Sequence, residues 1–154
     1  MIETLRRLAP PLLIVTLAVS AYLATRYWQD TRGGYRRVAS SEDCDLRLGS
    51  CTQSLGNGRV VFAITPSQIP LMQPLQLSVE VTGLAVDAVA VEIRGLNMDM
   101  GLNRTVLAGD AAGRWRGTAI LPVCSQRRMQ WEAAVRLDGT DRIELAFPFY
   151  TARP

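Results

Sequence analysis

The sequence predicts an all-β protein, a seven-stranded antiparallel sandwich preceded by one transmembrane helix. An uncharged apolar run near the N-terminus, residues 8–24, has about the length that a bilayer core requires. From residue 59 onward, short segments alternate apolar and polar residues, and turn residues separate them roughly every dozen positions. No segment after the apolar run has a convincing helical period, so strands are expected throughout the remainder.

The apolar run is interpreted as a retained membrane anchor. Tyr27 and Trp28 follow it, where amphipathic rings favour the headgroup layer. The alternative is a cleaved signal peptide, with Arg6 and Arg7 as its basic region. The run is long for the apolar core of a signal peptide, which favours the anchor.

Two cysteines set the expected orientation. Cys44 and Cys51 bracket a short polar segment in which Gly49 lets the chain turn back, and a disulfide between them is the simplest interpretation. Disulfides persist outside the cytoplasm. Counting the arginines on either side of the anchor favours the opposite orientation, but we give the cysteines more weight. Residues 1–7 are therefore expected in the cytoplasm, with a single pass through a bacterial inner membrane and the C-terminal domain in the periplasm.

The chain behind the anchor divides into two parts. Residues 25–58 are polar and rich in glycine and serine, which predicts an extracytoplasmic linker closed by the disulfide loop. Residues 59–150 predict the sandwich, because apolar side chains share one face of several segments, as in antiparallel sheets. The seven expected strands are 59–65, 75–82, 88–94, 104–107, 114–121, 130–137 and 142–149.

The composition argues against several function classes. The chain contains no histidine and no lysine, so its 17 basic residues are all arginine. The arginines are spread along the chain and the net charge is only +3, which does not predict nucleic-acid binding. Without histidine the commonest general base is missing, and no phosphate-binding glycine loop is present. We therefore expect a protein that is not an enzyme.

The sulfur-bearing side chains fall in a pattern. If successive loops alternate between the two ends of the sandwich, the first, third and fifth loops share one end. Met72 lies in the first, Met98 and Met100 in the third, and Cys124 and Met129 flank the fifth. The pattern therefore predicts that these soft ligands gather at a single end of the domain.

Two spacings make this expectation sharper. An extended backbone would place the thioethers of Met98 and Met100 on one side, and a four-residue hairpin loop would set Cys124 opposite Met129. A thiolate with thioethers suits Cu(I) and suits harder ions badly. These four residues are the candidate Cu(I) site. The alternative is that the methionines fill gaps over the core and the cysteine is a small buried apolar residue.

Three stretches carry a resemblance to a known family: NMDMG, then LNRTVL, then GRWRGTAILPVC. Together with the anchor, residues 59–149 resemble the FixH/YtkA-like group of periplasmic domains. The resemblance implies an immunoglobulin-like sandwich and a function in copper traffic and respiratory oxidase assembly, with a membrane respiratory complex or a copper protein as partner. Many copper-handling relatives combine histidine with methionine in their sites. This chain has no histidine, so only a Cu(I) site carries over.

A second function remains open from the sequence. The domain could be a metal-free accessory or structural subunit that docks to a membrane protein complex through its helix and one face of the sandwich. Arg127 and Arg128 lie at an expected loop tip, where arginines are usually solvated. Beside a Cu(I) site they could instead meet an acidic partner protein.

Overall fold

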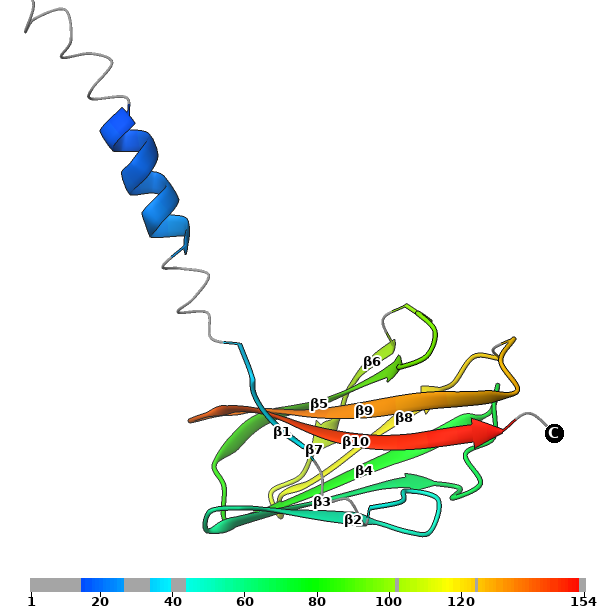
Figure 1. Ribbon diagram of the computed structural model, residues 1–154. Coiled ribbons are helices and arrows are strands. Elements are labelled where there is room, and N and C mark those ends of the chain that lie inside the picture. The colour runs from blue at the N-terminus through cyan, green and yellow to red at the C-terminus, as the bar shows by residue number, and fades with distance from the viewer. Residues whose placement is uncertain (1–14, 27–33, 40–43, 102, 124, 153–154) are drawn as a thin grey trace, which may run out of the picture. The chain divides into compact units, whose positions relative to one another are not determined.

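Two five-stranded sheets make up the domain in the computed structural model, which describes residues 15–26, 34–39, 44–101, 103–123 and 125–152 (Figure 1). Residues 15–26 form a helix. Among the residues described, no helix combines the length and the apolar character needed to cross a bilayer. Residues 8–14 of the expected anchor lie outside the described residues.

Sheet A has the order β1-β10-β9-β5-β6, and sheet B has the order β2-β3-β4-β8-β7. The strands are β1 (Arg36–Ala39), β2 (Cys51–Leu55), β3 (Gly58–Thr65), β4 (Pro74–Thr82), β5 (Val86–Gly95), β6 (Asn103–Val106), β7 (Ala108–Gly109), β8 (Arg114–Ile120), β9 (Arg128–Gly139) and β10 (Arg142–Ala152). Strands β3-β4-β8-β7 facing β10-β9-β5-β6 are consistent with an immunoglobulin-like arrangement.

The prediction of seven strands was too low, because ten strands lie within the described residues. Each of the seven expected segments is a strand, and β9 and β10 extend beyond their expected ends. The additional strands are β1, β2 and β7, of which the first two lie in the segment expected to be a linker. The prediction of a wholly antiparallel sandwich was also wrong, since β1 pairs with β10 in parallel.

Alternation along the strands separates a core face from an outer face. The apolar residues of β4, at every second position from Leu75 to Val81, are buried while their neighbours are exposed. Phe62 of β3 and Phe147 of β10 meet across the two sheets with ring centroids 5.3 Å apart. Trp131 of β9 is buried, and its indole N–H donates a hydrogen bond to Thr151 Oγ1 at 2.9 Å. The core therefore ties both sheets together and leaves the indole nitrogen satisfied.

The disulfide loop is part of this core. Cys44 and Cys51 are bonded, with their α-carbons 5.5 Å apart, so the predicted pairing is confirmed. Between them Leu46 is 0% exposed and belongs to the core cluster, while Leu48 is 88% exposed. The loop thus inserts one leucine between the sheets, and the disulfide restrains the chain on either side of it.

Charged residues cover the outer face of sheet A. Three carboxylates on β5, β9 and β10 are buried, and the arginines around them donate hydrogen bonds or form ion pairs with each one. No buried side-chain nitrogen or oxygen in the described part of the chain lacks a hydrogen-bond partner. Such a network is costly to break, because removing one partner leaves another charge buried alone. Its members are Arg37, Glu92, Arg94, Glu132, Arg136 and Glu144.

Leu46→Ala should lower the free energy of unfolding by about 2–5 kcal/mol, because it leaves a cavity in the core. Leu48→Ala is the matched control, since it removes the same three carbon atoms from an exposed side chain of the same loop, and it should stay within about 0.5 kcal/mol of wild type. Urea denaturation of the full chain with the disulfide intact measures both. Equal effects of the two substitutions would show that Leu46 does not fill the core.

Stability should also depend on Glu144 in a specific pH range. Burial raises the pKa of Glu144, but hydrogen bonds from Arg136 and Arg94 outweigh it and hold this pKa below its ordinary value of 4.5. The pKa of Glu144 is lower in the folded protein than in the unfolded one. Ionised Glu144 therefore makes its full contribution to the free energy of unfolding above pH 4.5, and this contribution is lost as the pH falls through the folded pKa. The urea midpoint of the wild type should fall over that range.

Glu144→Gln removes the titrating group and should cost about 1–3 kcal/mol near neutral pH while flattening the acid dependence. Glu80→Gln, on the exposed face of β4, is the matched control and should change neither property. An acid profile for Glu144→Gln as steep as that of the wild type would contradict this role.

Candidate functional site

Parts of three loops lie toward one end of the sandwich: 66–73 between β3 and β4, 96–101 between β5 and β6, and the described residues 121–123 and 125–127 between β8 and β9 (Figure 1). The first and third are joined by the N–H of Met72, which donates to the carbonyl of Leu121 at 2.8 Å. The second joins the start of β9, where the N–H of Leu96 donates to the carbonyl of Gln130 at 2.8 Å. The structure therefore places the loops that carry the methionines beside one another.

Gly95, the last residue of β5, lies against the methionine side chains. A β-carbon added there would lie 2.3 Å from Met129 Cε, 3.4 Å from Met100 Cγ and 2.2 Å from the carbonyl oxygen of Met98. The side chains of Met100 and Met129 therefore both lie beside Gly95, and Met129 occupies space that a larger residue would need. Met129 is 2% exposed, and Met98 and Met100 are partly buried against the core. We call Met98, Met100 and Met129 the methionine cluster.

Asn97 holds the loop over this cluster. Its amide nitrogen donates to the carbonyl of Arg128 at 3.1 Å, and its amide oxygen accepts the N–H of Gln130 at 3.1 Å. The next turn is closed by Asp99, whose carboxylate accepts the N–H of Gly101 at 2.9 Å. These hydrogen bonds attach the loop to the backbone of β9 and close its turn without help from a ligand.

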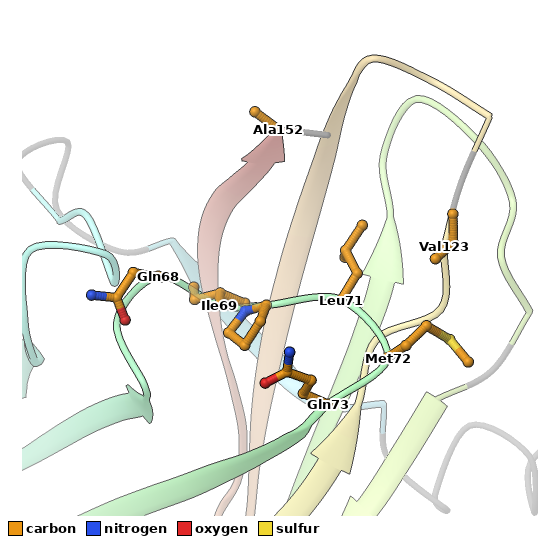
Figure 2. Close-up of a pocket in the computed structure, with 8 residues that line it drawn as sticks. Gln68, Ile69, Leu71, Met72, Gln73, Val123 and Ala152 are labelled. Carbon is orange, nitrogen blue, oxygen red and sulfur yellow. The ribbon is translucent and has the colours of Figure 1, made fainter. Parts of the chain in front are cut away.

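Met72 lies apart from the methionine cluster in a separate environment. It is 63% exposed and lines a pocket of about 430 Å³ formed mainly by loop 66–73. Figure 2 shows Val123 and Ala152 on neighbouring segments at the rim of the same pocket. Ile69 and Met72 have positive φ angles of 48° and 57°, which is strained backbone, most of all for a β-branched residue.

Cys124 lies outside the described residues, so its side chain is not placed. The hairpin that would have set it opposite Met129 is wrong. Strand β8 pairs with β4 and β7 in sheet B, whereas β9 pairs with β5 and β10 in sheet A. Residues 121–127 therefore cross between the sheets, and Met129 lies opposite Thr151 of β10.

The chemistry at this end is that of soft ligands. In the described part of the chain, no group of three or more histidine, cysteine, aspartate or glutamate residues is arranged to hold a metal ion. The methionine cluster offers thioether sulfur, which suits Cu(I). Sequence reasoning found the methionines but treated Gly95 only as a turn signal and assigned no role to Asn97. The available signal for this contact was the glycine at the end of β5, because a glycine in a strand often marks a place where another part of the chain packs closely against the backbone.

Comparisons with known proteins show no family for this chain. No family model matches the chain, and no curated protein matches it. Among solved structures, the chain is similar to a DUF4426 family protein from Pseudomonas aeruginosa PAO1 at 14% sequence identity and a TM-score of 0.39. That match covers 66% of this chain and 94% of the other. Membership of the FixH/YtkA-like group is not shown by these comparisons.

Proposed function

We propose that this chain is a membrane-anchored periplasmic module that binds Cu(I) and passes it on, without catalysing a reaction. The observation that carries the proposal is that the side chains of Met100 and Met129 and the backbone of Met98 all lie against Gly95. Cu(I) accepts three or four sulfur ligands. Cys124, which the sequence places five residues before Met129, would supply the anionic ligand and the strongest bond.

The pattern of close contacts supports a ligand site more than simple packing. Filling a gap over the core needs one flexible methionine, yet methionines from two separate segments converge on one glycine. The hydrogen bonds of Asn97 order a loop at the edge of the domain, where loops are usually mobile, and this ordering has a cost in conformational entropy. A site assembled in advance binds its ion with less loss of conformational entropy.

Export from the cytoplasm is supported by the Cys44–Cys51 disulfide, because such bonds persist in oxidising compartments. The apolar run at residues 8–24 is the proposed anchor. A respiratory complex that receives copper during assembly is the proposed destination, as the resemblance of the sequence implies. These parts of the proposal are independent of the metal site and can fail separately from it.

Competition against a chromogenic Cu(I) chelator tests the metal site. The full chain is kept in non-ionic detergent with ascorbate, which holds copper as Cu(I) while the disulfide stays closed. Cys124→Ser should weaken binding most, and Met98→Leu, Met100→Leu and Met129→Leu should each weaken it by about tenfold, or roughly 1.4 kcal/mol. Methionine to leucine nearly preserves side-chain volume, so a broken core would not explain the loss.

Met72→Leu is the matched control, because Met72 lies at the same end but in a separate pocket, and its affinity should equal that of wild type. Gly95→Ala should also weaken binding, since its β-carbon would displace the Met98 carbonyl and the Met129 methyl group. If wild type competes no better than the variant without all four sulfurs, the copper proposal is wrong. The metal-free accessory subunit then becomes the better account.

A further inference from the structure

A groove on the outer face of sheet A lies on the other side of β9 from the methionine cluster. It has a volume of about 220 Å³, and its lining includes Leu96, Gln130, Pro148 and Tyr150. Leu96 is 53% exposed, and Pro148 is also exposed, so part of the lining is apolar and open to solvent. Arg128 completes the rim. We call this the Tyr150 groove.

Tyr150 is held between two guanidinium groups. The Cζ atom of Arg128 lies 4.0 Å from the centre of the tyrosine ring, and that of Arg47 lies 3.4 Å from it. Two guanidinium groups so close to one centroid cannot share a face of the ring, so they stack on opposite faces. Contact with the ring restrains both guanidinium groups, and their N–H groups can still donate to other acceptors.

The two arginines differ in what their N–H groups already bind. Arg47 donates from Nε and Nη2 to the two carboxylate oxygens of Asp45, at 3.1 and 2.7 Å, and these bonds lower the pKa of Asp45. Among the described residues no carboxylate forms an ion pair with Arg128 or with its exposed neighbour Arg127. Arg128 therefore presents an oriented guanidinium edge, without a counter-charge, at the rim of an apolar groove.

We propose that the Tyr150 groove binds an acidic peptide segment of a partner protein, with a carboxylate paired to Arg128 and a neighbouring apolar side chain against Leu96 and Pro148. A planar guanidinium and a carboxylate form two parallel hydrogen bonds, which sets the position of the segment. The Gln130 side chain in the lining can bond the backbone of an extended peptide. Charge complementarity thus selects the occupant, and the inference does not require copper.

The same features disfavour an anionic membrane surface. A bilayer needs a broad basic face, whereas the basic residues here alternate with acidic ones: Asp45 pairs with Arg47, and Glu132, which lies opposite the groove residue Pro148, pairs with Arg94. An apolar surface inside a concave groove also reaches a peptide side chain more readily than a flat headgroup layer.

Fluorescence anisotropy of the full chain in non-ionic detergent tests this inference. The probe is a fluorescein-labelled peptide in which glutamates flank a central leucine and tyrosine, with the corresponding lysine peptide as its charge-reversed partner. Arg128→Gln should weaken binding of the glutamate peptide by about tenfold or more, because it removes the charged hydrogen bonds. Arg116→Gln, exposed on β8 in sheet B, is the matched control and should bind as wild type does.

Arg128→Glu gives the decisive comparison, because it should reverse the preference and bind the lysine peptide better than the glutamate peptide. A fold defect would weaken both peptides alike and could not produce that reversal. Equal affinity of wild type for the two peptides would overturn the proposal. So would stronger binding to phosphatidylserine vesicles, with no competition from the peptide.

Discussion

The pairing of β9 with β10 is the interaction on which the rest of the structure depends. Eleven residues of each strand lie opposite one another, from Arg142 opposite Asp138 to Ala152 opposite Arg128. One face of the pair supplies Trp131 and Phe147 to the core, and the other supplies Glu132 and Glu144 to the ionic network. Because side chains alternate in direction along a strand, a shift of one residue would exchange these two faces. The register of this single pair therefore determines what is apolar and what is charged across sheet A.

The same alternation separates the two candidate sites at the start of β9. Met129 points to the core side, where its methyl group reaches the α-carbon of Gly95. Its neighbours Arg128 and Gln130 belong to the outer side and line the Tyr150 groove. Asn97 hydrogen-bonds to the backbone of both Arg128 and Gln130, so one side chain braces the loop that borders both sites. A partner bound in the groove would thus contact Arg128 and Gln130, which flank Met129 in β9.

The sequence predicted the parts of the fold that follow from local alternation and missed those that need long-range contacts. β4, with four apolar residues at alternate positions, has the period of a half-buried strand and was found. β1 has only Arg36–Ala39 and no alternating apolar face, and its parallel partner β10 lies over one hundred residues away, so nothing local marks it as a strand. The hairpin between β8 and β9 failed for a related reason, since a short connection can join two strands of one sheet or cross between sheets. The contact at Gly95 brings together residues from two separate strands and a loop, and no spacing in the sequence encodes it.

The central claim is that the methionine cluster acts as one soft-ligand site, and methionine-methyl NMR tests it most directly. The full chain is labelled with carbon-13 at the methionine methyl groups, and Cu(I) is added in steps. The account predicts that the resonances of Met100 and Met129 shift together and stop shifting at one copper per chain, while the exposed Met72 stays in place. A shift of Met72 with no change at Met100 and Met129 would contradict it, and the cluster would then be core packing at the end of the sandwich.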